Sequence, residues 1–281
     1  MSPYRITEPT CISFSGGRTS AYMLKKVLDA GGGQLPDQAI VCFANTGKEE
    51  EATLKFVNDC SVNWGVKINW IEYQDHEEPE HRYKVVSYET ASRNGEPFEA
   101  IIRKRQYLPN PVTRFCTSEL KIRTMACFLK HSGLFDDYTK SELENSSWIG
   151  LRYDEGRRAA KIIDQRRIPL FTAKVSVQHI GEFWEKQSFN LELPTYKGRT
   201  LAGNCDLCFL KPANQIATLI AENPKRAIWW ANMEALALAS KPSGATFRKD
   251  RPNYESMVKF AAEQLTVFDD TEEGIACFCG D

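Results

Sequence analysis

The sequence predicts an α/β fold with a mostly parallel sheet, flanking helices and a helical C-terminal portion. Three runs of strand character, near residues 12–14, 39–44 and 67–73, alternate with two helical patterns. Such alternation gives parallel strands joined by right-handed crossovers. A small polar turn follows each of the first two strands. Because ligands of open α/β sheets bind beyond the carboxyl ends of the strands, we expect both turns to face one crevice.

Bulk composition limits the classes of protein that this chain can belong to. Its 281 residues suffice for one large α/β domain or for a core domain with a smaller appendage. A net charge of −1 gives no general attraction to nucleic acid or to an anionic membrane. No apolar run approaches the roughly 20 residues of a membrane span, and the first residues lack the apolar core of a signal peptide. We therefore expect a cytoplasmic protein with no membrane partner.

The chain divides into two predicted regions. Residues 1–204 form a nucleotide-binding α/β region, and residues 205–281 form a helical, cysteine-bearing region packed on it. The charged stretch 74–112 interrupts the alternating pattern and indicates an insertion or a lid. Its histidines, His76 and His81, are candidate ligands, although a surface loop is ordinarily polar.

Order returns after residue 113 with a predicted helix. Thr117 or Ser118 can cap this helix, which places Cys116 just before it. The dipole of a helix start favours a thiolate at that position. A fourth strand is predicted over residues 147–152.

The stretch from residue 13 to residue 20 predicts an anion-binding loop. It runs from a strand through a Ser/Gly turn into a helix, so several backbone N–H groups and the positive end of a helix dipole meet at one point. The glycines permit close approach of the backbone, and the hydroxyls add donors. The candidate binding residues of this loop are Ser13, Ser15, Gly16, Gly17, Arg18, Thr19 and Ser20.

Two further groups of candidate binding residues lie at predicted strand ends. The turn after the second strand consists of Asn45, Thr46 and Gly47. The fourth strand leads into guanidinium groups, which are forked donors for anionic oxygens. These groups belong to Arg152, Arg157 and Arg158.

The nine cysteines indicate metal or redox chemistry, because a chain without an export signal is a poor candidate for a disulfide framework. Cys205 and Cys208 are two residues apart and can reach one centre from a single turn, or can act as a redox dithiol. A metal centre needs further ligands. The candidates are Cys116, Cys277 and Cys279.

Four stretches together resemble the PP-loop family and, within it, the phosphoadenylyl-sulfate (PAPS) reductase-like branch. They are Ser13–Ser20, the Asn45-Thr46-Gly47 turn, the segment from Arg114 to Lys121, and Gly150-Leu151-Arg152 with the two arginines that follow. The resemblance covers about the first two thirds of the chain. It implies the adenine-nucleotide alpha-hydrolase-like fold. The late Cys205–Cys208 segment and the terminal Cys-x-Cys resemble a version carried by bacteriophages and prophages.

The sequence departs from the family pattern at several positions. Asn45 stands where the family has an acidic residue, and Cys116 is single where the iron–sulfur adenylyl-sulfate reductases have two adjacent cysteines. Gly17 matches ATP pyrophosphatase-type members better than the sulfonucleotide reductases. The end of the chain, Phe278-Cys279-Gly280, only partly matches the Glu-Cys-Gly nucleophile of those reductases.

The resemblance implies a metal centre, for which two ligand sets compete. One is a [4Fe–4S] cluster on Cys116, Cys205, Cys208 and Cys279, beside the nucleotide crevice. The other is a structural zinc ion on Cys205, Cys208, Cys277 and Cys279. We favour the cluster.

The resemblance also implies an adenine nucleotide, ATP or PAPS, with its phosphates on the Ser15–Ser20 loop. The implied catalytic residues are Cys279, Arg152 and Lys121. In one chemistry a thiolate reduces a sulfonucleotide, with a thiol reductant protein as partner. In the other, ATP adenylates an acceptor, a nucleic acid, a protein or a small molecule, for sulfur insertion, with Mg²⁺ as an additional cation. A non-catalytic nucleotide-binding or sensing protein is a third hypothesis.

Overall fold

A five-stranded sheet forms the centre of the protein in a computed structural model, which describes residues 2–162, 164, 167–196, 199–240 and 242–263. The strand order is β4-β3-β2-β1-β5. The first three strands and β5 are parallel, and β4 runs antiparallel to β3. The predicted α/β class with a mostly parallel sheet is therefore confirmed. The strands are β1 (Thr10–Ser13), β2 (Ala39–Asn45), β3 (Ile68–Glu72), β4 (Lys84–Val86) and β5 (Ser147–Trp148).

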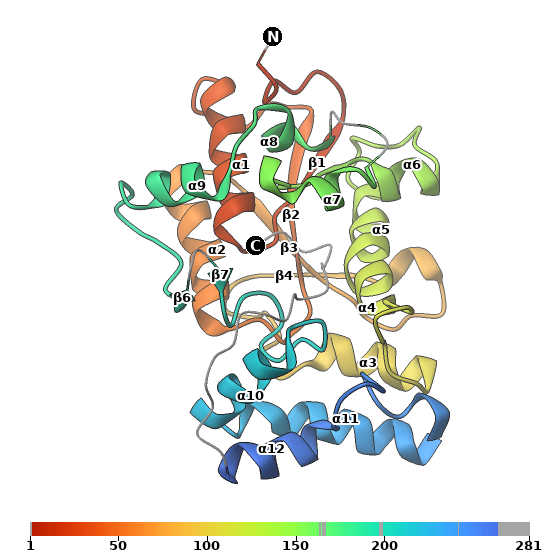
Figure 1. The fold of residues 1–281 in the computed structure, drawn as a ribbon. Helices are drawn as coiled ribbons and strands as arrows, with labels where there is room; N and C mark the ends of the chain where they lie inside the picture. The colour runs from red at the N-terminus through yellow and green to blue at the C-terminus, as the bar shows by residue number, and fades with distance from the viewer. Residues whose placement is uncertain (1, 163, 165–166, 197–198, 241, 264–281) are drawn as a thin grey trace.

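Helices cover both faces of this sheet (Figure 1). On one face, Ile12 and Phe43 pack in the apolar core that includes α1 (Arg18–Ala30) and α2 (Glu51–Trp64). On the other face, residues such as Cys42 pack in a second core, with α5 (Thr124–Lys130) and α6 (Lys140–Asn145). Central strands buried on both sides have nearly continuous apolar sequences, which explains the run at β2.

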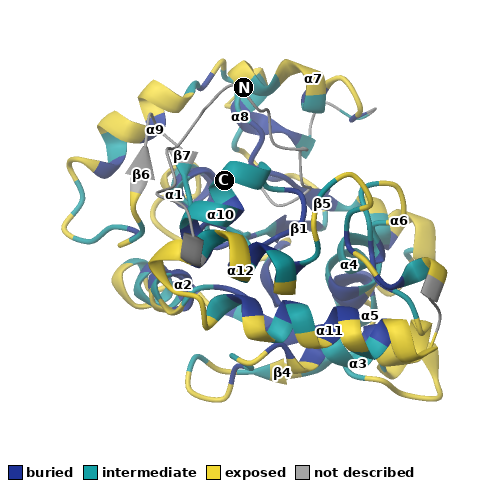
Figure 2. Ribbon diagram, turned by 60° about the horizontal axis from the view of Figure 1, so that its bottom comes forward, coloured by how far each residue is buried: buried dark blue, intermediate teal, exposed yellow. Residues whose placement is uncertain are grey.

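A helical lobe lies across the carboxyl ends of the strands (Figure 1). Figure 2 shows its inner surfaces buried and its outer surfaces exposed. One apolar core joins residues 98–120 to residues 202–257, so the predicted C-terminal region is built together with a much earlier segment. The helices of this lobe are α3 (Glu96–Arg105), α10 (Ala213–Glu222), α11 (Arg226–Ser240) and α12 (Tyr254–Glu263).

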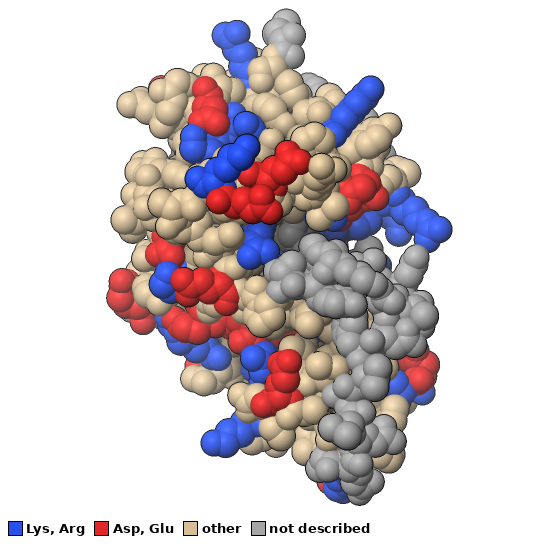
Figure 3. All heavy atoms as spheres, turned by 60° about the vertical axis from the view of Figure 1, so that its left-hand side comes forward, with Lys and Arg blue, Asp and Glu red and all other residues tan. Residues whose placement is uncertain are grey.

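None of the helices within the described residues has both the length and the apolar character of a membrane span. On the described part of one face, Lys and Arg side chains are interspersed with Asp and Glu (Figure 3), as the net charge of −1 would suggest. The remaining α-helices and strands are α4 (Phe115–Thr117), α7 (Gly156–Ala159), α8 (Pro169–Thr172), α9 (Val177–Trp184), β6 (Thr195–Tyr196) and β7 (Arg199–Thr200). A π-helical segment, Ser118–Arg123, joins α4 to α5.

The stretch 74–112, predicted to be an insertion or a lid, contains β4 and α3. The structure corrects two expectations about the segments that follow. The helix after residue 113 begins at Phe115, so Cys116 lies within its first turn, and Thr117 and Ser118 are not its caps. The fold makes this early start possible because Phe115 is buried in the core of the helical lobe.

The predicted fourth strand is also shorter than expected. Strand β5 ends at Trp148, and the chain then passes the start of α1. A Cβ atom on Gly150 would lie 3.1 Å from the Cα atom of Ser20, so a side chain there would push the two segments apart by a few tenths of an ångström. Residues up to Arg152 are thereby placed beside the Ser/Gly loop although they are not part of the sheet.

Candidate functional site

The loop between β1 and α1 is held by a small network of hydroxyl and backbone groups. The Ser15 N–H donates to Ser20 Oγ at 3.2 Å, and the two serine hydroxyls are 2.9 Å apart. The Ser20 hydroxyl also donates to the Gly17 carbonyl at 3.0 Å. Gly16 has a φ of +80°, and a Cβ atom there would lie 2.6 Å from Thr53 Cγ2. This glycine therefore lets the loop pack directly on α2.

The start of α1 has the features of an anion site. Gly17 occupies its N-cap position and so provides no side-chain acceptor, and the first turn contains no acidic residue. A helix N-terminus without such acceptors presents N–H donors and a positive dipole end to a ligand.

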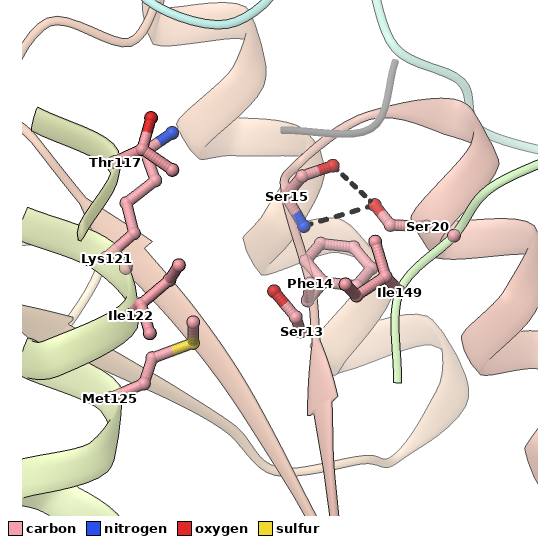
Figure 4. Close-up of a pocket in the computed structure, with 11 residues that line it drawn as sticks. Ser13, Phe14, Ser15, Ser20, Thr117, Lys121, Ile122, Met125 and Ile149 are labelled. Atoms are coloured by element: carbon pink, nitrogen blue, oxygen red, sulfur yellow. Dashed lines mark hydrogen bonds between the residues drawn. The ribbon is translucent and has the colours of Figure 1, made fainter. Parts of the chain in front are cut away.

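A pocket opens beside this loop. Thr117 and Lys121 lie across it from Ser15 and Ser20, and Met125 lines its lower wall (Figure 4). The enclosed space of the pocket is about 40 Å³. An ammonium group, four hydroxyl side chains and a helix start therefore share one hollow. The full lining is Ser13, Phe14, Ser15, Ser20, Ala44, Thr117, Lys121, Ile122, Met125, Ile149 and Gly150.

Arg152, which lies a few residues after the end of β5, reaches the start of α1. Its guanidinium donates to Thr19 Oγ1 at 3.1 Å. It also pairs with Asp154 at 3.2 Å and with Glu155 at 3.6 Å. The carboxylates of Asp154 and Glu155 thus hold the guanidinium in place while its Nη1 atom donates to Thr19 in the loop.

The other predicted arginines are placed differently. Arg158 pairs with Glu155, and Arg157 is exposed. Arg18 turns its side chain away from the pocket, donating to Asn190 Oδ1 and to the Leu191 carbonyl, each at 2.8 Å. Arg152 therefore contacts the loop through its side chain.

The turn after β2 is closed, in contrast to the loop after β1. Asn45 is fully buried, and its amide donates to Glu72 Oε1 at 2.6 Å and to the Ser92 carbonyl at 2.9 Å. Lys84 balances the buried Glu72 carboxylate at 2.8 Å. A carboxylate in place of the Asn45 amide would face that of Glu72, which gives a physical reason for the asparagine.

Residues 46–49 of this turn bind the cysteine segment. The Thr46 N–H donates to Glu49 Oε2 at 3.0 Å, and its hydroxyl lies 3.5 Å from Cys205 Sγ. Lys48 and Asp206 form a buried ion pair at 3.1 Å. The Asp206 N–H also donates to the Lys48 carbonyl at 2.8 Å. The turn therefore positions the Cys205–Cys208 segment.

The helical lobe holds the same segment from the other side. Asp206 Oδ1 accepts from Trp230 Nε1 at 2.9 Å and from the Leu207 N–H at 2.7 Å. The Tyr254 hydroxyl donates to the Leu207 carbonyl at 2.6 Å. Buried polar groups satisfied in this way fix one conformation of the segment.

The cysteines fit a metal–thiolate centre chemically. Cys205 and Cys208 are buried, and Cys116 packs against the same apolar core. Burial, with Glu49 adding to it, raises the pKa of Cys205 far above its ordinary value, and nearby Lys121 acts in the opposite direction. A buried thiolate needs a cation close by, and a metal ion supplies one.

Cys205 and Cys208 belong to both predicted ligand sets, and Cys116 belongs to the cluster set alone. Among the described residues, the Sγ atoms of Cys116, Cys205 and Cys208 do not all lie within 4.8 Å of one another. The fourth predicted ligand, Cys279, and its neighbour Cys277 lie outside the described residues.

Several residues of this site were not predicted from the sequence. Lys48, Glu72 and Asp206 had no motif that would have identified them. Thr53 lines a small hollow beside Gly16 and Gly17, and its buried hydroxyl has no hydrogen-bond partner among the described residues. Glu49, two positions after Thr46-Gly47, is visible in the sequence, but as an acidic residue there it indicated only the start of a helix and not a role in the turn.

The fold is that of an α/β protein with a pocket, lined by hydroxyl groups and Lys121, at the carboxyl edge of a mostly parallel sheet. The chain is similar to the uncharacterized nin region protein ORF290 of Escherichia phage lambda, with 27% identity over 216 residues. The alignment covers 73% of this chain and 67% of the phage protein. This similarity supports a bacteriophage-type protein. No family model matches the chain. No solved structure matches it either.

Proposed function

We propose that the protein is an adenine-nucleotide-dependent enzyme similar to the PAPS reductases, with the PP-loop at Ser15–Ser20. The nucleotide phosphates would bind the N–H groups at the start of α1. A cysteine-ligated metal centre on Cys116, Cys205, Cys208 and Cys279 would lie beside them, with a [4Fe–4S] cluster favoured over zinc.

One observation carries this proposal. Lys121 lines the pocket of the Ser15–Ser20 loop and also lies close enough to Cys205 to affect the pKa of its thiol. A single ammonium group therefore connects the anion loop with the cysteine segment. We infer that Lys121 stabilises charge on the nucleotide, and that Arg152, held beside Thr19, meets a second anionic group.

In the reductase chemistry, a cysteine thiolate attacks the sulfur of a sulfonucleotide. The S–O bond to the phosphate breaks, the nucleoside phosphate leaves, and the sulfite group remains on the cysteine. A thiol of a reductant protein then attacks this cysteine, so that sulfite leaves and a disulfide forms. Cys205 is buried with a raised pKa, which suits a ligand better than a nucleophile. The nucleophile in this chemistry would be Cys279, which could serve there only when it is not bound to the metal centre.

The alternative chemistry is ATP pyrophosphatase activity that adenylates an acceptor for sulfur insertion. The acceptor oxygen attacks the α-phosphorus of ATP, and pyrophosphate leaves. The glycine at the N-cap of α1, Gly17, favours this alternative, because it leaves the helix start open to a pyrophosphate. The Ser15 and Ser20 hydroxyls and Lys121 would hold the leaving group, with Mg²⁺ as a bound cation.

Incubation of the purified full chain with PAPS plus a thiol reductant, or with ATP plus Mg²⁺, tests the proposal. Sulfite release supports the reductase chemistry, and pyrophosphate release supports the alternative. Lys121→Ala should lower either rate by about 10²-fold or more, since it removes a positive charge from the transition state. Lys130→Ala, which removes an ammonium group at the end of α5 and outside this pocket, is the matched control. Tight nucleotide binding without either product would identify a binding protein and refute both reactions.

Metal content tests the cysteine centre separately. Anaerobic purification should give a brown protein with about four irons per chain. Cys116→Ser should remove the brown colour of the protein, because it removes a proposed ligand. Cys127→Ser, which changes a cysteine of α5 outside the proposed ligand set, should leave the colour unchanged. A colourless protein with one zinc ion, or full iron retention in Cys116→Ser, would contradict the ligand set.

A further inference from the structure

Three of the four histidines of the chain gather on one side of α5, away from the nucleotide pocket. The rings of His76 and His81 are 5.4 Å apart. The ring of His131, which follows α5, stacks on His81 at 5.3 Å with an interplanar angle of 2°. The fourth histidine, His179, lies on α9. Residues separated by about fifty positions in the chain therefore bring imidazoles to one place.

Two carboxylates complete this group. Glu78 Oε2 lies 3.1 Å from His81 Nε2. One ligand atom from each of Glu78, Glu80 and His81 lies within 4.8 Å of the others. All three side chains are exposed, so solvent ions can reach them.

We propose that Glu78, Glu80 and His81 form a binding site for a borderline divalent metal ion of the Zn²⁺ class. The mixed set of imidazole nitrogen and carboxylate oxygen is the donor set that such ions prefer, and it differs from the oxygen-only sets that suit Mg²⁺ or Ca²⁺. Three protein ligands leave at least one coordination position for water or for a ligand of the metal.

The surrounding contacts hold these donors in place. His76 Nδ1 accepts from the Glu78 N–H at 3.1 Å, which orders the start of the turn. The Cys127 thiol donates to the Pro79 carbonyl at 3.3 Å and ties the turn to α5. The Tyr83 hydroxyl lies 3.2 Å from His131 Nδ1 and fixes the ring that stacks on His81. Outer contacts of this kind orient metal ligands and tune their affinity.

The site opens on a wide groove that the proposed nucleotide chemistry does not use. Glu78 and Glu80 line this groove together with Glu119, Glu144 and basic side chains from four segments. Some of the basic groups are already paired, Lys104 with Asp75 and Arg105 with Glu119. A bound dication would offset the charge of Glu78 and Glu80 and so shift the potential of the groove in the positive direction. The groove would then favour an anionic group as the further ligand of the metal. The basic lining residues are Arg82, Lys104, Arg105, Arg123, Lys130 and Lys140.

Zinc titration of the full chain tests this site, and its outcome does not depend on the proposed nucleotide chemistry. The number and affinity of bound Zn²⁺ ions would be compared among wild type, His81→Ala, the double variant Glu78→Gln/Glu80→Gln, and His179→Ala. We expect His81→Ala and the double variant to lose one zinc ion per chain, or to bind it at least tenfold more weakly. His179→Ala removes an exposed histidine elsewhere and should match wild type.

Cobalt substitution separates this site from the cysteines. The difference spectrum between Co²⁺-loaded wild type and His81→Ala should lack thiolate-to-metal charge transfer, because the proposed ligands carry no sulfur. Equal zinc binding by all variants, an equal loss in His179→Ala, or a thiolate band in the difference spectrum would each overturn the proposal. Because the three side chains are exposed, circular dichroism should show the same folded signal for every variant.

Discussion

The loop after β1 and the turn after β2 lie at neighbouring strand ends but differ in what occupies their polar groups. The loop after β1 faces a pocket, and the start of α1 lacks a side-chain cap. The turn after β2 is buried, with Asn45 bound to Glu72 and Thr46 bound to Glu49. Its outer side is covered by Cys205 and Asp206.

This difference shows that polar residues at a strand end can serve two purposes. They can remain open for a ligand, or they can bind another segment of the chain and position it. In this protein the first strand end does the former and the second does the latter. The second turn would contribute to chemistry indirectly, by holding the cysteine segment near Lys121.

The largest expected effect comes from opening the closed turn. Asp206→Ala leaves the buried Lys48 ammonium and the Trp230 N–H without their shared acceptor. We expect a loss of about 3–5 kcal/mol in the free energy of unfolding, because one partner of a buried ion pair remains unpaired. Urea denaturation measures it. Glu255→Ala, which removes an exposed carboxylate paired with Lys259, should cost less than about 1 kcal/mol. Similar losses in both variants would show that the ion pair does not close the turn.

The helical lobe that holds the cysteine segment against the closed turn should depend on pH in its stability, because Glu234 binds Tyr254 and Tyr254 binds Leu207. Burial raises the pKa of Glu234, which accepts the N–H groups of Phe247 and Tyr254, to about 7. This carboxyl is protonated in the folded state at pH values where it is ionised in the unfolded state. Stability should therefore fall as pH rises, by about 2 kcal/mol between about pH 5.5 and pH 8. Denaturation of Glu234→Gln at the same pH values should lack this contribution; an unchanged slope would contradict it.

The open loop can be tested with two glycines of similar backbone conformation. Gly16 has a φ of +80° and Gly33 has a φ of +92°. A Cβ atom at Gly16 would collide with Thr53, whereas a Cβ atom at Gly33 would have no atom within 4 Å. Alanine costs about 1–2 kcal/mol at either position because of the positive φ. At Gly16 we expect a further loss of about 1–2 kcal/mol and weaker nucleotide binding, because the loop must move off α2. Thermal unfolding and ATP titration of both variants measure the difference, and equal effects would show that the packing is unimportant.

The smallest expected effect follows from restoring an acidic residue to the closed turn. Asn45→Asp loses one of the two donated hydrogen bonds even when the new acid stays protonated, which costs about 1 kcal/mol. The cost should grow as pH rises, because the ionised acid would face Glu72. Urea denaturation at two pH values measures this change. A gain in stability at high pH would indicate that the turn prefers a carboxylate and is open to a cation.

The sequence predicted the main elements of the fold correctly, because apolar periodicity records which faces of a strand or helix are buried. It also predicted that Ser15 and Arg152 face one crevice, since the carboxyl ends of parallel strands lie at one edge of a sheet. It did not predict that Cys116 lies inside a helix or that α3 belongs to the helical lobe. Those placements depend on packing against residues more than a hundred positions away.

The sequence by itself therefore determined the parallel sheet, the position of the Ser/Gly loop and the polar character of both strand ends. Only the tertiary structure decided which strand end stays open. The partners that close the second turn, Glu72, Asp206 and Trp230, come from three separate segments of the chain. Hydrogen bonds and ion pairs between such segments depend on the whole fold, and no local pattern of residues records them.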